Sequence, residues 1–223
     1  MTTAIKRFFN RSMSDIIFDV VLFILCFAIF IIIAYPLYFI IIASFSNAQY
    51  VNQGKVIFLP KGVSLYGYTK IFEDARIWTG YKNTIFYTIG GTLINLLFTL
   101  PAAYALSQKS FKARKVIMPL FVFTMFFNGG MIPTYMLMRD LNLINNVLVM
   151  MLPFCVNVYN LIITRSFFEN SIPGDLYEAA ILDGCSHFRY FLTIVIPLSK
   201  AVISVITLYY FVGHWNDFFN ALL

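Results

Sequence analysis

Charged residues are scarce in this chain: they make up 12% of its 223 residues, whereas 60% are hydrophobic. An average soluble domain carries about twice that charged share, so this composition cannot cover an ordinary water-facing surface. Cysteine is also rare, and Cys26, Cys155 and Cys185 stand far apart without metal-ligand spacing. We interpret the cysteines as small apolar packing residues, not as metal ligands or disulfide partners.

Several sequence patterns of enzymes and of ion-driven proteins are missing as well. The chain has no Gly-x-x-x-x-Gly-Lys-Ser/Thr phosphate loop and no His-Glu-x-x-His pair. His187 and His214 lie too far apart in the expected topology to share a proton or a metal. We therefore expect no catalytic residue, no metal site and no cofactor of its own.

Long apolar blocks are what the chain has instead. No charge occurs from Val20 to Phe45, a stretch of roughly 39 Å as a helix, which exceeds the ~30 Å hydrocarbon core. This block is too long for a cleaved signal peptide, so we expect it to be retained. The sequence predicts an all-α membrane protein with spans at about 16–45, 83–106, 115–138, 146–168 and 191–213.

The net charge of +6 comes from basic residues that cluster at the ends of these apolar blocks. Lys6, Arg7 and Arg11 precede the first span, and four basic residues crowd positions 109–115. The positive-inside rule then places residues 1–15 and the 169–190 loop in the cytoplasm and the 46–82 loop outside. Basic residues also occur in the 46–82 loop, but they are more dispersed, and residues 67–75 there favour a short interfacial helix. A nucleic-acid partner is not expected.

Residues 172–200 form the cytoplasmic segment with the most distinctive pattern. Pro173 suits the first turn of a helix, and Gly184 suits a helix stop because glycine adopts left-handed angles freely. An eleven-residue helix is predicted between them, with Ser186 capping a second helix that continues into the last span. The centre of the first helix is Glu178-Ala179-Ala180, where two small side chains let a partner surface approach closely.

This segment resembles the EAA loop of the permease subunits of ABC importers. Glu178, Ala179, Ala180, Asp183 and Gly184 fall on the family pattern, and Ile194 and Ile196-Pro197 follow at the expected distance. The alternative is a solvated helix with an ordinary glycine cap. The resemblance implies that the loop seats in a groove of a separate ATPase subunit, and that the chain has the transmembrane fold of a type I importer. That fold has six spans, so the five visible here predict a chain truncated before its last span, with residues 16–223 forming one permease domain.

Further runs resemble the carbohydrate-importer permeases of the maltose type. They are Asn83-Thr84, the run from Pro101 to Leu106, the run from Phe126 to Tyr135, and the run from Gly213 to Phe218. The third of these is similar to permeases paired with oligosaccharide-binding lipoproteins in Gram-positive bacteria. The resemblance implies a bacterial plasma-membrane subunit that moves a sugar or oligosaccharide inward by alternating access. Its implied partners are a second homologous permease, an ABC ATPase dimer that binds ATP and Mg, and an extracytoplasmic sugar-binding lipoprotein.

A possible translocation path is suggested by polar and irregular positions inside two spans. Irregular backbone at membrane depth needs protein or a water-filled path beside it, and amides and phenols suit sugar hydroxyls. The candidate residues are Asn128, Gly129, Gly130, Tyr135, Asn157, Tyr159 and Asn160. For each of them a helix–helix contact is the alternative interpretation. The run from His214 to Asp217 is interpreted as a membrane anchor or as a contact for the binding protein.

Three rival functions remain at this point. The first is the same kind of permease carrying another solute, such as a phosphonate or a polyamine, because the EAA loop does not read cargo. The second is an ion-coupled transporter, which would need an ionisable residue at mid-depth, and none is apparent in the predicted spans. The third is an intramembrane enzyme, which would need a paired nucleophile and base or metal-ligand spacing inside the spans, and neither is apparent in the sequence.

Overall fold

The structure, a computed structural model, describes residues 12–127, 129–153 and 155–222. Its regular elements within those ranges are all helical, which confirms the predicted all-α class. The chain forms two compact units, residues 1–78 and 79–223, and the boundary between them falls inside helix α5.

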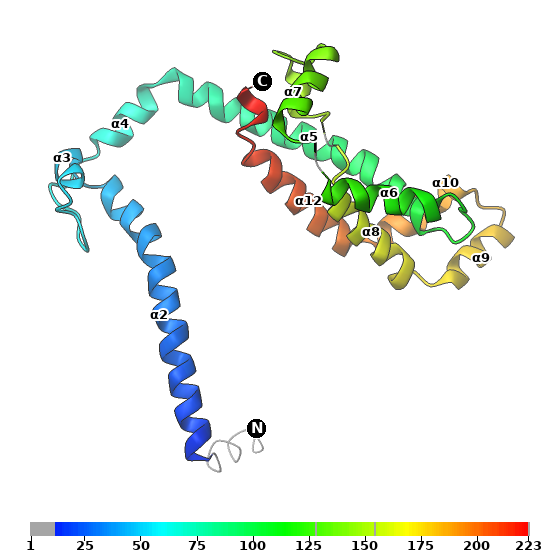
Figure 1. Cartoon of the computed structure of the whole chain (residues 1–223), viewed down its shortest axis with the longest axis horizontal. Helices are drawn as coiled ribbons and strands as arrows, with labels where there is room; N and C mark the ends of the chain where they lie inside the picture. The colour runs from blue at the N-terminus through cyan, green and yellow to red at the C-terminus, as the bar shows by residue number, and fades with distance from the viewer. Residues whose placement is uncertain (1–11, 128, 154, 223) are drawn as a thin grey trace. The chain divides into compact units, whose positions relative to one another are not determined.

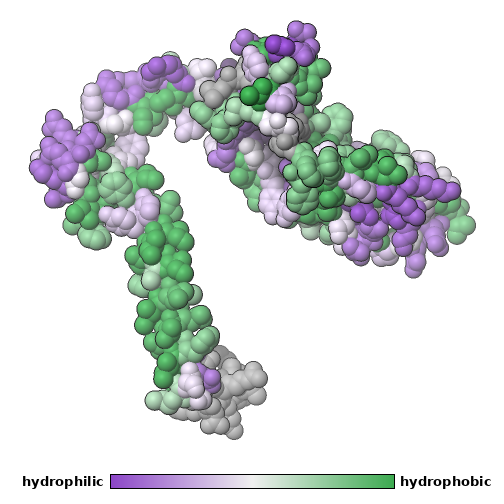
Figure 2. Space-filling view, viewed as in Figure 1, coloured by the Kyte–Doolittle hydropathy of each residue, from purple (hydrophilic) through white to green (hydrophobic). Residues whose placement is uncertain are grey.

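Helix α2 (Met13–Ser44) dominates the first unit. It is 32 residues long, and none of its most apolar 18-residue window is buried. Large apolar side chains such as Phe23 and Ile32 are exposed around it, and Figure 2 shows an almost uniformly hydrophobic rod. A helix that is apolar on all sides suits lipid and not water. Its bounds agree closely with the span expected at 16–45.

The chain after α2 folds back on the end of that helix. Two short helices, α3 (Ala48–Asn52) and α4 (Tyr66–Glu73), flank a loop whose Ser64 N–H donates to the Phe45 carbonyl over 3.0 Å. Gly62 has a φ of +62° in this loop, the left-handed turn that its position suggests. Helix α4 agrees with the helix expected at 67–75.

Helix α5 (Ala75–Ser107) begins eight residues before the expected span at 83–106. The external loop expected at 46–82 is shorter for this reason. One face of α5 carries a row of buried polar residues, Thr88, Thr92, Asn95 and Thr99. Their spacing of four, three and four residues is the helical repeat, so all four lie on one side.

The span expected at 115–138 is divided into two helices. Helix α6 (Arg114–Phe126) and helix α7 (Met131–Asp140) differ in direction by more than 40°. Gly130 between them has a φ of +86°, which a side-chain-bearing residue adopts only with strain. The interruption expected here is confirmed, although Asn128 itself lies outside the described residues.

The segment expected as a span at 146–168 is not one continuous helix. A 3₁₀ turn, η1 (Val147–Met150), is followed by irregular chain, and α8 (Val158–Ser171) then has 14 residues. That is about 21 Å of helix, less than the ~30 Å hydrocarbon core. The Asn157 side chain caps α8 by accepting from the Asn160 N–H over 3.1 Å, so the helix begins there.

The remaining helices follow the predicted order with two differences. Helix α9 (Gly174–Leu182) has nine residues instead of eleven. Ser186 caps α10 (His187–Tyr190) as expected, and the Ser186 hydroxyl accepts from the Arg189 N–H over 3.3 Å. The chain continues through a π-helical turn, η2 (Phe191–Val195), α11 (Ile196–Leu198), α12 (Lys200–Trp215) and η3 (Asn220–Leu222).

The segment expected as a span at 191–213 bends by 83° at Ser199. By length and composition, two helices of the described chain, α2 and α5, are able to cross a membrane unaided. Counting each bent pair as one crossing gives up to four. Helix α8, in the span expected at 146–168, has 14 residues and is not among the helices counted, so the count of five spans stays a prediction.

Helices α5, α6, α8 and α12 pack together in the second unit (Figure 1). Leu161 of α8 and Ile206 of α12 are fully buried at the centre. A polar chain crosses this core. The Tyr210 hydroxyl lies 2.7 Å from the Thr99 hydroxyl and accepts from the Asn157 N–H over 3.1 Å. Tyr210 thereby joins α5, the start of α8 and α12.

Replacing Tyr210 with Phe should destabilise this unit. The change removes the hydroxyl and leaves the Asn157 N–H and Thr99 without their partner, a loss of about 1 kcal/mol for groups inside a membrane protein. Unfolding of the purified protein in mixed detergent and SDS micelles measures it. The matched control is Tyr209→Phe, on the exposed side of the same helix. Equal midpoints for the two variants would contradict the assigned role of the Tyr210 hydroxyl.

Candidate functional site

The loop predicted to contact a partner presents one face of α9 and buries the other. Ala180 is 7% exposed and packs into the core, whereas Glu178 and Ala179 are exposed. Asp183 ends the helix, and Gly184 takes a φ of +72°, the left-handed stop that the sequence predicts. Leu182 is 88% exposed beside them. The exposed face of α9 is thus partly apolar, although it lies in a polar loop.

The buried face of α9 is tied to the bundle by aromatic rings. The Tyr177 ring stacks on His187 at 5.7 Å between centroids and meets Tyr190 edge-on at 5.3 Å. The Tyr177 hydroxyl is also 3.1 Å from His187 Nδ1. Tyr104 of α5 continues the series, with centroids 6.4 Å from Tyr190 and 5.0 Å from Phe191. This series of rings links α9 to α5 through Tyr190 of α10.

A cluster of three charged side chains lies where α5, α6 and α8 meet. Glu169 accepts from Arg165 over 2.8 Å and from Arg114 over 3.1 Å. Arg165 Nε also donates to the Leu106 carbonyl over 3.1 Å, at the end of α5. The negative end of a helix dipole favours such a cation. The three side chains are between 20% and 27% exposed, so water screens them only partly.

A cavity of about 430 Å³ separates these two clusters. Its lining comes from the end of α5, the loop after it, the end of α8, and α9. Glu178 and Glu169 both line it, as does Tyr104, whose buried hydroxyl has no hydrogen-bond partner within the described chain.

The predicted path residues are only partly brought together. A groove of about 630 Å³ between α6, α7 and the start of α8 is lined by Gly129, Asn157 and Tyr159. Gly130 and Tyr135 lie on the same elements but do not line the groove. Asn160 is 4% exposed and also stays out of the groove. The Asn157 amide oxygen is already engaged in capping α8.

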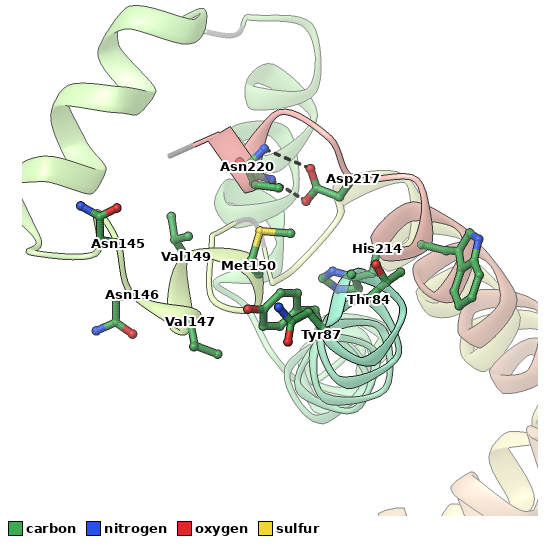
Figure 3. A pocket seen from close by; sticks show the side chains of 14 residues that line it. Thr84, Tyr87, Asn145, Asn146, Val147, Val149, Met150, His214, Asp217 and Asn220 are labelled. Atoms are coloured by element: carbon green, nitrogen blue, oxygen red, sulfur yellow. Dashed lines mark hydrogen bonds between the residues drawn. The ribbon is translucent and has the colours of Figure 1, made fainter. Parts of the chain in front are cut away.

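A third cavity, the α12 cavity, has about 420 Å³ and lies where the beginning of α5, η1 and the end of α12 meet (Figure 3). Here His214 is a packing residue: a Cβ on Gly91 would lie 2.5 Å from its ring, and Nε2 is 3.4 Å from the Asn95 amide oxygen. The expected membrane-anchor role does not describe His214. Trp215 remains 42% exposed.

Sequence reasoning missed the charged cluster and the polar row of α5. The polar row was detectable, because Thr88, Thr92, Asn95 and Thr99 follow the helical repeat within an apolar block. The cluster was not, since Arg114 and Glu169 are 55 residues apart in sequence and only the packing of α6 on α8 joins them.

Comparison with known proteins identifies the family. Residues 77–223 match the family described as binding-protein-dependent transport system inner membrane component. This chain belongs to that family. The matched region includes the whole second unit described above, and with it α9, the charged cluster and the α12 cavity.

Two relatives come from Bacillus subtilis (strain 168). The protein LplC is 39% identical over 84% of this chain and 63% of its own length. The polygalacturonan/rhamnogalacturonan transport system permease protein YtcP is 37% identical over 95% of this chain and 73% of its own length. This chain thus spans less than two thirds of the length of LplC, at 63%, and 73% of the length of YtcP.

A solved structure is also similar. It is a bacterial ABC transporter involved in the import of the acidic polysaccharide alginate, and it matches with a TM-score of 0.88 at 38% identity. The match covers 93% of this chain and 74% of the other. The fold is therefore that of an ABC importer permease, as the EAA loop implies, and the protein is embedded in a membrane.

Replacing Glu169 with Gln should destabilise the second unit by about 1 to 2 kcal/mol, because two partly buried arginines lose their counter-charge. Thermal unfolding of the purified protein in detergent measures the change. The matched control is Asp140→Asn, whose partner Arg139 is 57% exposed. That exposed pair should contribute less than about 0.5 kcal/mol. A shift in the control as large as in Glu169→Gln would show that the cluster has no special role.

Proposed function

We propose that this chain is the membrane-embedded permease subunit of a bacterial ABC importer for a sugar or oligosaccharide. The observation that supports it best is the similarity, at 37–38% identity, to YtcP, named for polygalacturonan and rhamnogalacturonan, and to the alginate importer. A relative at 29% identity is named for arabinooligosaccharides. These names favour a saccharide over a phosphonate or a polyamine, and the family favours ATP over an ion gradient.

In this proposal the exposed face of α9 is the contact for a separate ATPase subunit. Leu182 and Phe188 are 88% and 71% exposed at the end of the loop. Large apolar side chains grouped in a polar loop mark a protein-binding surface. Glu178 stands beside them as the polar member of the contact. ATP and Mg are then bound by the partner, and this chain supplies no catalytic residue.

The transmission route runs from α9 through Tyr177, Tyr190 and Tyr104 into α5. Closure of the ATPase dimer displaces α9, and the stacked rings transfer the displacement to the bundle. The break at Gly130 and the bend at Ser199 are points where the helices change direction without a continuous hydrogen-bond ladder. A homologous second permease completes the path. The N-terminus and α9 lie on the cytoplasmic side of the plasma membrane.

Uptake by the complete transporter tests this function. The permease pair, the ATPase dimer and the binding protein are reconstituted in liposomes with labelled oligosaccharides. We expect inward transport that depends on ATP and on the binding protein. Transport driven by an ion gradient without ATP would refute the proposal, and so would uptake of a phosphonate or a polyamine in place of every saccharide.

Replacing Glu178 with Lys tests the docking face. The reversed charge should reduce co-purification of the ATPase and lower uptake about tenfold or more, because a charge placed against an evolved partner costs several kcal/mol. The control is Asp140→Lys, a charge reversal at the end of α7 with both measurements unchanged. Normal ATPase recovery with Glu178→Lys would rule out the assigned contact.

A further inference from the structure

The loop between α3 and α4 has an apolar tip. Residues 56–60 carry no charge and stand between two lysines. Within the tip, Ile57, Phe58 and Leu59 are 52%, 68% and 72% exposed. Three large apolar side chains side by side in an exposed loop are unfavourable in water and mark a contact with an apolar surrounding.

Two tyrosines of α2 hold this tip against the helix. The Tyr35 hydroxyl donates to the Ile57 carbonyl over 3.2 Å, and the Tyr38 hydroxyl donates to the Phe58 carbonyl. The rings of Tyr35 and Phe58 also meet edge-on, with centroids 6.0 Å apart. Tyr35 and Tyr38 precede the last residue of α2, Ser44, by two turns or less of helix, so the tip runs back about 9 to 14 Å along it. Figure 1 shows the loop beside the end of α2.

The depth of the tip follows from the length of α2. A hydrocarbon core of ~30 Å takes up about 20 helical residues. The charge-free part of α2 begins at Val20, so the core ends near Phe39. Tyr35 and Tyr38 then lie at the far edge of the hydrocarbon core, the depth at which tyrosine is enriched. Backbone carbonyls at this depth need protein donors, and the two hydroxyls supply them.

The two flanking lysines are held beyond the tip. The Lys55 ammonium lies 6.0 Å from the centroid of the Tyr50 ring in α3. The Lys61 N–H donates to the Ser46 hydroxyl over 3.2 Å, and its carbonyl accepts from the Asn47 N–H over 3.1 Å. Ser46 and Asn47 follow the end of α2, which puts both lysines at the level of the lipid headgroups. Lysines near a membrane surface extend their ammonium groups to that level.

We infer that residues 56–60 insert into the bilayer leaflet around the far end of α2. The apolar tip lies among the acyl chains, and Lys55 and Lys61 contact lipid phosphates. Insertion requires only that the protein is embedded in a membrane, so it depends neither on the cargo nor on ATP. A water-soluble partner would approach from the aqueous side, whereas the tip points back along the span.

A spin label at position 59 tests the insertion. Leu59→Cys is labelled in a chain whose Cys26, Cys155 and Cys185 are replaced with Ala. The protein, with the subunits that co-purify with it, is placed in nanodiscs of phosphatidylglycerol and phosphatidylethanolamine. Power saturation then compares collisions of the label with oxygen, which concentrates in lipid, and with a nickel chelate, which stays in water.

The matched control is a label at Gln53→Cys, an exposed position of the same loop outside the tip. The logarithm of the ratio of oxygen to nickel accessibility should be positive at position 59 and negative at position 53. A negative value at position 59 overturns the insertion. A label that neither reagent reaches also overturns it, because another protein would then cover the tip.

The double variant Tyr35→Phe/Tyr38→Phe tests the anchor. It keeps both rings and removes both donors, so two carbonyls at membrane depth lose their partners. The accessibility ratio of the label at position 59 should fall toward that at position 53. The matched control is Tyr66→Phe, an exposed tyrosine of α4, which should leave the ratio unchanged. An unchanged ratio in the double variant, or an equal fall in the control, overturns the role assigned to the two hydroxyls.

Discussion

The Tyr210 hydroxyl makes two hydrogen bonds, one with the Thr99 hydroxyl and one with the Asn157 N–H, and these organise the second unit. A membrane interior offers no water to a broken helix, so backbone freed at a helix start must find a protein partner. The Tyr210 hydroxyl is that partner for the beginning of α8. Because the same hydroxyl reaches α5, the short helix α8 is held against the two helices that surround it. The arrangement of α8 then determines where the loop to α9 leaves the bundle.

Two clusters of side chains lie at the end of the bundle that is next to α9. The aromatic series from Tyr177 to Tyr104 provides contact without charge, and the Arg165, Glu169 and Arg114 cluster holds the ends of α5, α6 and α8 at one point. Packed rings transmit displacement because protein interiors are dense and barely compressible. These features are consistent with the proposed role of α9 as a loop that a partner displaces.

The family and the boundaries of the loop around α9 were predictable because they depend on local pattern. Gly184 adopts left-handed angles, Ser186 caps α10, and the chain breaks at Gly130, all as their residue types suggest. The break within the segment expected as a span at 146–168 was not predictable, because an apolar block does not show where its helix begins. Asn157 caps α8 inside that block, and apolar residues before it form the η1 turn instead of a helix. Of the path residues that the structure describes, Gly129, Asn157 and Tyr159 share a groove.

By itself the sequence determined that this protein is embedded in a bilayer, that it is helical, and that its 172–200 segment matches the EAA loop of a transport permease. Composition and short-range spacing carry that information. Composition determines whether the surface suits lipid or water, and short-range spacing determines where helices end and which motif is present. Only the tertiary structure decided which polar residues meet. The partners of Tyr210, the cluster around Glu169 and the lining of the α12 cavity join residues tens of positions apart. Such contacts depend on how whole helices pack, and that packing is not a local property of the chain.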